Sequence, residues 1–189
     1  MKNTVKKYLI ITLVMTMLAS LVCSFAAKGE DTVCVPQISG SYILGVAPDT
    51  TFAKLVDVMP NKIVEVTKKD GTVLGKSSDK LIATGDDIRI NGSHYTTVVL
   101  GDLNCDGMIN DVDVELLKRN IQLGSVPQSV STKLFMTAAL GKSSDTKTTV
   151  VSYLKLKRHM SGTYDVYESY KQPSSSIGDD ESGWSDKWN

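Results

Sequence analysis

The chain has 189 residues, of which 41% are apolar, and its 21 Lys and Arg are balanced by 21 Asp and Glu. This length suffices for one or two small globular modules and excludes a catalytic domain with accessory domains. The balanced charge gives no sign of an excess of basic residues that could bind nucleic acid, so we expect no nucleic-acid partner.

Residues 1–26 have the composition of a secretory signal peptide. Three lysines (Lys2, Lys6 and Lys7) precede an apolar run at 8–22, and small residues lead to Ala26. The run is shorter than the ~20 residues of a membrane span, so we expect cleavage after Ala26 and no stable span. The alternative is a retained membrane anchor. The sequence therefore predicts a secreted, extracellular protein.

Two cysteines, Cys34 and Cys105, follow the signal peptide. An extracellular setting would permit them to form a disulfide. The alternative is two partly buried free thiols, and the spacing in the sequence does not decide between the two.

Residues 27–100 have the pattern of a small β-rich module with one helix. The expected order is a strand, a helix and four strands, at 41–46, 52–59, 62–67, 72–74, 87–90 and 94–100. Asp70-Gly71 and Asn91-Gly92 separate two pairs of these strands, and both dipeptides are hairpin signals. The module shows no constellation of nucleophile, base and orienting group, so we expect no enzymatic activity.

The stretch after Gly101 carries oxygen-bearing side chains at the spacing of an EF-hand calcium loop. Loop positions 1, 3, 5, 9 and 12 are Asp102, Asn104, Asp106, Asn110 and Asp113. Ca²⁺ takes six to eight oxygens at about 2.3–2.6 Å, so alternate side chains of a curled loop must point inward. Gly107 stands at the sharp turn of position 6, and Met108 at position 7 supplies a backbone carbonyl. The alternative is an acidic surface loop with a helix N-cap, but the matched positions favour one bound calcium ion.

The helix after this loop recurs later in the chain, but its loop does not. Lys118-Arg119 corresponds to Lys157-Arg158, and the apolar helix positions correspond as well. The positions that match the five side-chain ligands are Gly141, Ser143, Asp145, Thr149 and Ser152. One carboxylate and a few hydroxyls cannot offset the dehydration of calcium, so the second repeat is predicted to bind no metal.

The leading Gly101-Asp102, the closing Asp113 and the Leu-Leu-Lys-Arg run at 116–119 resemble the first calcium repeat of a type I dockerin. The resemblance implies an all-α domain at 101–163, a pair of calcium-loop and helix repeats of which the second is degenerate. The expected fold class is α+β, with the β-rich module before the helical pair, as in secreted clostridial and ruminococcal proteins. Residues 164–189 lack periodicity and are predicted to be a disordered tail.

The resemblance also implies a partner, a cohesin domain of a scaffoldin. Dockerins contact it through loop positions 10 and 11 and through the basic pair of each helix. In this sequence those positions are Asp111, Val112, Lys118, Arg119, Val150, Val151, Lys157 and Arg158. Family members often have Ser-Thr at positions 10 and 11, so a different cohesin specificity is expected here. For Lys118 and Arg119 the alternative is a solvated helix face that the helix dipole favours.

The expected function is calcium-dependent docking onto a cohesin of a cellulosome-type, polysaccharide-degrading complex outside the cell. Such docking would hold the protein at the cell surface wherever its scaffoldin is anchored there. The alternative is a calcium-stabilised, secreted structural or surface protein that binds no cohesin.

Overall fold

The computed structural model describes residues 32–59, 63–139 and 147–173. The predicted signal peptide at 1–26, the second-loop positions Gly141, Ser143 and Asp145, and the part of the predicted tail after Pro173 lie outside these ranges. No helix within the described ranges has the length and apolar character needed to cross a membrane.

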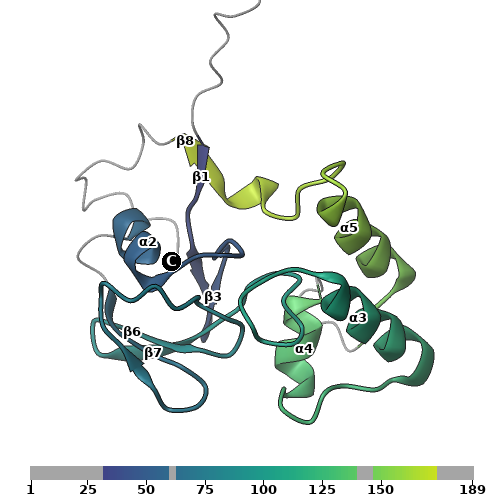
Figure 1. Ribbon diagram of the computed structural model, residues 1–189, viewed down its shortest axis with the longest axis horizontal. Coiled ribbons are helices and arrows are strands. Elements are labelled where there is room, and N and C mark those ends of the chain that lie inside the picture. The colour runs from purple at the N-terminus through teal and green to yellow at the C-terminus, as the bar shows by residue number, and fades with distance from the viewer. Residues whose placement is uncertain (1–31, 60–62, 140–146, 174–189) are drawn as a thin grey trace, which may run out of the picture. The chain divides into compact units, whose positions relative to one another are not determined.

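A six-stranded mixed sheet is built from the residues before the calcium-loop motif (Figure 1). Its strands are β2 (Gln37–Ser39), β3 (Tyr42–Leu44), β4 (Ile63–Thr67), β5 (Val73–Leu74), β6 (Asp87–Ile90) and β7 (Ser93–Thr97). Their spatial order is β2-β3-β7-β6-β4-β5, with β3 and β7 paired in parallel and the other neighbours antiparallel.

The hairpin between β6 and β7 follows from its turn residues. Asn91 and Gly92 have φ of 49° and 83°. A two-residue type I′ turn needs positive φ at both central positions, which Asn and Gly adopt most easily. Ile90 then pairs with Ser93, so the predicted hairpin is confirmed.

Helix α2 (Phe52–Val58) packs against the sheet through residues at helical spacing. The Thr51 side chain caps the helix by accepting a hydrogen bond from the Lys54 N–H, and Phe52 and Leu55 are buried. These two side chains share a core with sheet residues. The core comprises Ile43, Val46, Phe52, Leu55, Met59, Val66, Leu74, Ile82, Ile88, Ile90 and Val99.

A second core lies among α3 (Asp111–Leu123), α4 (Thr132–Ala138) and α5 (Val150–Met160). The consecutive residues Val98 and Val99 are both fully buried, Val98 in this second core and Val99 in the sheet core. Successive side chains of an extended chain point to opposite sides. The segment that leaves β7 therefore joins the two cores.

The predicted fold class is wrong in its architecture. We expected an all-α pair of repeats after a small module, whereas the described residues form an α+β fold with four helices, a six-stranded mixed sheet and a two-stranded sheet. The described residues from Val33 onward belong to one compact unit. Short helices cannot bury enough apolar surface by themselves. Here their apolar faces pack on Val98, Leu100 and Leu103, which come directly from the sheet.

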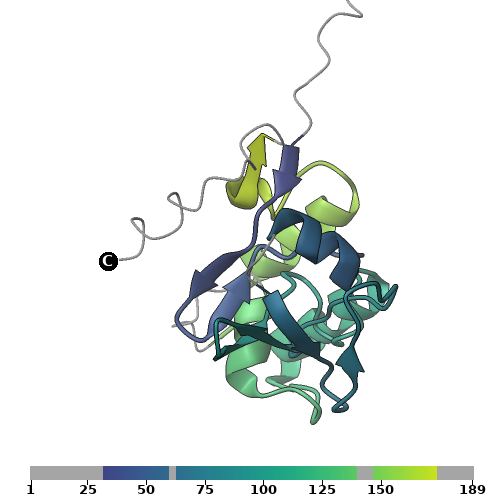
Figure 2. The same cartoon turned by 90° about the vertical axis from the view of Figure 1, so that its left-hand side faces the viewer.

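Residues 164–173, which we call the C-terminal strap, are ordered, although the sequence predicted a disordered tail from residue 164. They contain the 3-10 helix η1 (Glu168–Tyr170) and β8 (Lys171–Pro173). Strand β8 pairs with β1 (Thr32–Cys34), and the two lie side by side in Figures 1 and 2. The strap is held by partners far away in the sequence, which local periodicity does not reveal.

Two backbone groups outside the strap anchor it. The buried Tyr167 hydroxyl donates to the Leu100 carbonyl at 2.9 Å, and the Val35 N–H donates to the Tyr170 carbonyl at 2.8 Å. Burial raises the pKa of Tyr167 well above its usual value, so the hydroxyl keeps its proton and remains a donor.

Replacing Tyr167 by Phe should lower the free energy of unfolding by about 1–3 kcal/mol, because the buried Leu100 carbonyl loses its partner. Urea unfolding measures the change. Tyr164→Phe is the matched control, since Tyr164 is 38% exposed and should change stability by less than about 0.5 kcal/mol. Equal losses in the two variants would contradict the role of this hydrogen bond.

Cys34 and Cys105 are both free thiols and both half-buried. The structure therefore agrees with the second of the two alternatives. Burial, followed by the Asp165 carboxylate, raises the pKa of the Cys34 thiol. Burial likewise raises the pKa of Cys105, to about 11.

For the protein cleaved after Ala26, which retains only Cys34 and Cys105, we expect two titratable thiols in urea. In the native protein near neutral pH we expect slow alkylation of Cys34. A raised pKa leaves less thiolate, which is the nucleophile, at any given pH below it. Mass spectrometry after iodoacetamide labelling, with and without urea, reports both quantities. A chain lighter by two hydrogen atoms that resists labelling in urea would instead demonstrate a disulfide.

Candidate metal centre

The loop at 102–113 connects the segment that leaves the sheet to the first turn of α3. Gly107, at loop position 6, has φ of 85°, as the sharp turn requires. A Cβ at this position would lie 2.6 Å from the Ile82 carbonyl oxygen, so the loop also approaches the sheet segment closely here. Glycine at position 6 therefore serves both the turn and the packing of the loop on the sheet.

The Asp102 carboxylate at position 1 is fully buried and accepts backbone N–H groups from two directions. Its Oδ2 accepts from Thr84 at 2.9 Å and from Gly107 at 3.1 Å, and its Oδ1 accepts from Asp106 at 3.1 Å. Asp106 and Gly107 belong to the loop, whereas Thr84 belongs to the sheet region. The sequence did not predict the Thr84 contact, because no local pattern links that turn residue to the loop.

The Asp113 carboxylate at position 12 is fully buried and closes the loop. Its Oδ1 accepts from the Leu103 N–H at 2.7 Å and the Asn104 N–H at 3.1 Å, and its Oδ2 accepts from the Asn110 N–H at 2.9 Å. Asn110 in turn caps α3, since its Oδ1 accepts from the Val112 N–H at 2.9 Å. This reciprocal arrangement is a capping box.

The two buried carboxylates place negative charge where water cannot solvate it. The pKa of Asp102 is raised to about 6, chiefly by burial and in part by the neighbouring Asp113 carboxylate. Burial also raises the pKa of Asp113. Neither carboxylate forms an ion pair with a Lys, Arg or His of the described ranges. A cation between them would stabilise both charges.

The remaining predicted side-chain ligands meet at Asp106. Its Oδ2 accepts from the amide nitrogens of Asn104 at 2.7 Å and Asn110 at 3.4 Å, and its Oδ1 accepts from the Met108 N–H at 2.8 Å. Hydrogen bonds thus link the side chains at positions 3, 5 and 9. Cation binding would require the two amides to turn their oxygens inward, because their nitrogens now face the carboxylate.

The described residues contain no cluster of three or more His, Cys, Asp and Glu side chains that could hold a metal. A site in this loop must therefore also use the side-chain oxygens of Asn104 and Asn110 and the Met108 carbonyl. An all-oxygen donor set with no imidazole or thiolate fits a hard cation such as calcium.

All eight predicted partner contacts, which we call the contact set, are exposed on α3 and α5, two helices that contact each other (Figure 1). Its apolar members Val112, Val150 and Val151 are 53%, 59% and 60% exposed. Leu154, one turn further along α5 and 52% exposed, extends this apolar surface, although no sequence motif had indicated it. Apolar side chains this exposed on adjoining helices are a feature of protein-binding surfaces.

The basic members of the contact set have weak partners of their own. Lys118 and Arg119 each lie 3.6 Å from the Glu115 carboxylate, and Arg158 lies over the Tyr164 ring at 6.0 Å from its centroid. Exposed pairs of this kind are worth about 0.2–1 kcal/mol, so these side chains are free to rearrange on a partner.

In the second repeat, the described positions that match metal ligands have another role. The Thr149 hydroxyl accepts from the Ser152 N–H at 3.3 Å and caps α5. A hydroxyl cap satisfies the helix terminus without a cation.

No protein-family model, curated protein or solved structure matches this chain. The loop and the helix faces described above are therefore the features that point to a function.

Asp113→Ala should lower the free energy of unfolding by more than about 3 kcal/mol, because three backbone N–H groups lose a charged acceptor together. Asp111→Ala, at an exposed position two residues earlier in the same turn, should cost less than about 1 kcal/mol, the loss of a helix-dipole contact. Thermal and urea unfolding in calcium-free buffer compare the two. A similar loss in both variants would mean that the three hydrogen bonds to Asp113 add no more stability than an exposed helix-dipole contact.

Proposed function

We propose that the chain binds one calcium ion in the loop at 102–113 and docks onto a cohesin through the exposed faces of α3 and α5. The ligands are the side-chain oxygens of Asp102, Asn104, Asp106, Asn110 and Asp113 and the carbonyl of Met108. The observation that carries the proposal is the pair of fully buried carboxylates, Asp102 and Asp113, which have no cationic partner in the described ranges and stand at EF-hand spacing. Bound calcium supplies the positive charge that balances them.

The loop and the contact set are coupled through the start of α3. Asp113 is at once a ligand in the proposal and a member of the capping box, and Asp111 and Val112 are its neighbours in the same turn. A fixed first turn holds these two contacts in one orientation, which lowers the entropy lost on binding. The proposal needs no separate all-α domain, because the sheet supports the helices.

The proposed setting is outside the cell, as the composition of residues 1–26 suggests, in a polysaccharide-degrading assembly organised by a scaffoldin. The chain contributes attachment and no catalytic step.

A second candidate function is a calcium-stabilised structural or surface protein without a cohesin partner. The contacts of the loop with the sheet favour it: the Thr84 N–H donates to Asp102, and the Asp49 N–H donates to the Gly107 carbonyl at 2.9 Å. A metal held between two parts of one fold can serve stability alone.

Calorimetry on metal-free protein tests the first half of the proposal, with one calcium ion per chain as the expected stoichiometry. Two ions per chain would place a second site in the degenerate repeat. No binding would refute both candidate functions, because each needs the metal.

A pull-down with a panel of cohesins, in calcium and after chelation, tests the second half. Val151→Asp should weaken capture at least tenfold by placing a charge in the proposed interface. Val73→Asp is the matched control, since Val73 is a 58% exposed valine on β5, outside the contact set. Calcium binding without capture by any cohesin would favour the structural candidate.

A further inference from the structure

The sheet region contributes a segment, residues 81–86, that contacts the calcium loop from outside. The Thr84 N–H donates to Asp102 Oδ2, and Gly107 packs so closely on the Ile82 carbonyl that no Cβ fits. The segment therefore touches both a proposed ligand and the loop's tightest turn.

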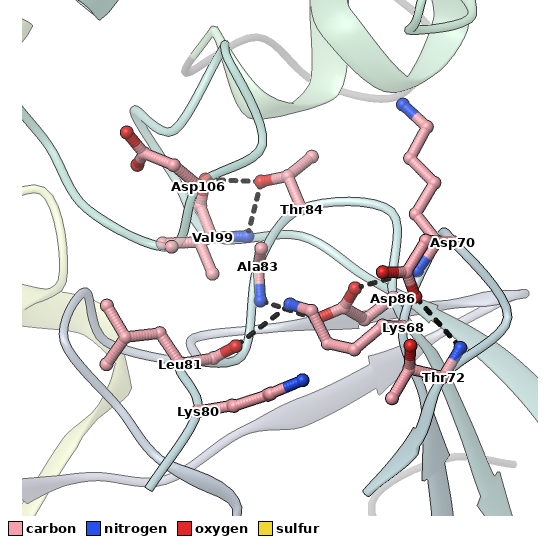
Figure 3. A network of polar contacts seen from close by, with 12 residues as sticks. Lys68, Asp70, Thr72, Lys80, Leu81, Ala83, Thr84, Asp86, Val99 and Asp106 are labelled. Carbon is pink, nitrogen blue, oxygen red and sulfur yellow. Dashed lines mark hydrogen bonds and ion pairs between the residues drawn. The ribbon is translucent and has the colours of Figure 1, made fainter.

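A partly buried ion pair within the sheet region holds this segment in place (Figure 3). Lys68 Nζ lies 2.5 Å from Asp86 Oδ2 and donates to the Leu81 carbonyl at 2.9 Å. The Asp86 carboxylate is almost fully buried and accepts from the Ala83 N–H at 2.8 Å and the Lys69 N–H at 3.2 Å. Both ends of the segment are thus fixed by groups that are not ligands.

The middle of the segment is fixed to the chain that leads into the loop. The Thr84 hydroxyl donates to the Val99 carbonyl and accepts from the Val99 N–H, each at 3.1 Å (Figure 3). Since Thr84 is buried, water does not compete for these bonds. Its N–H is therefore held in the direction of Asp102.

We propose that Lys68 and Asp86 act as positioning residues for the calcium site, by holding the Thr84 N–H against Asp102. The inference rests on the proposed calcium site and adds a support that no residue of the loop provides. A hydrogen bond to a ligating carboxylate fixes its orientation, and losing such a partner typically costs about 10–100-fold in metal affinity. By thermodynamic linkage, calcium must in turn order the segment that supports its ligand.

Calorimetry with calcium on the full chain compares three variants at a temperature where each is folded. Lys68→Met and Asp86→Asn should each weaken calcium binding about tenfold. Arg89→Met is the control, because it breaks an exposed pair on the same sheet, 3.6 Å from Glu65, that touches neither the segment nor the loop. Its affinity for calcium should equal that of the wild type.

Hydrogen exchange supplies a readout that a general loss of stability would not reproduce. Calcium should slow exchange at the Ala83 and Thr84 amides of the wild type, and Asp86→Asn should reduce this protection. The Tyr95 amide, in the β6-β7 hairpin, should be indifferent to calcium in both proteins. If Lys68→Met does not fold, Asp86→Asn and the exchange data decide.

The possible outcomes distinguish the positioning role of Lys68 and Asp86 from the proposed calcium binding itself. Wild-type affinity in the folded Asp86→Asn variant, or exchange at Thr84 that ignores calcium, would overturn the inference and leave the calcium site standing. A wild-type protein that binds no calcium would overturn the proposed function, and the inference with it.

Discussion

The fully buried Asp102 carboxylate needs hydrogen-bond donors in the folded protein, and separate parts of the structure meet to supply them. Its oxygens take N–H groups from Asp106 and Gly107 within the loop and from Thr84 beside the sheet. A buried charge left without partners would cost several kcal/mol, so these segments cannot separate independently. Two residues earlier, the Leu100 carbonyl receives the Tyr167 hydroxyl. Sheet, loop and strap are therefore fixed to one short stretch of backbone.

The two halves of the helical region are ordered by different chemistry. Helix α3 begins at buried carboxylates and a capping box, so the order of its first turn depends on charge. Helix α5 begins at a hydroxyl cap, and Leu156 is fully buried in the shared core. Apolar packing and a neutral cap need no ion. Helix α5 therefore keeps its place in the fold through its cap and its apolar packing.

Local patterns predicted the elements whose stability is local. The helical spacing of Phe52 and Leu55 placed α2, and the turn at Asn91 and Gly92 placed the β6-β7 hairpin. The oxygen spacing put five candidate ligands on one loop, which one stretch of sequence can specify. The predicted architecture was wrong because periodicity shows that one face of a helix is apolar but does not show which surface packs against that face. Local patterns did not predict the contacts of Thr84 and the strap for the same reason, because their partners are remote along the chain.

The pairing of β1 with β8 has a consequence for the order in which the fold is acquired. These strands are the first and last of the described chain, so their pairing closes almost its entire length. Contacts between such distant segments form late, because the entropy of closing the loop must be lost before any bond compensates. On the ribosome, β8 also emerges after every other described element. Until residue 167 has been made, the core beside Leu100 lacks Tyr167, and until residue 173 has been made, β1 has no paired strand. The nascent chain therefore keeps an unpaired strand edge, which other chains could pair with, until its last described strand has been made.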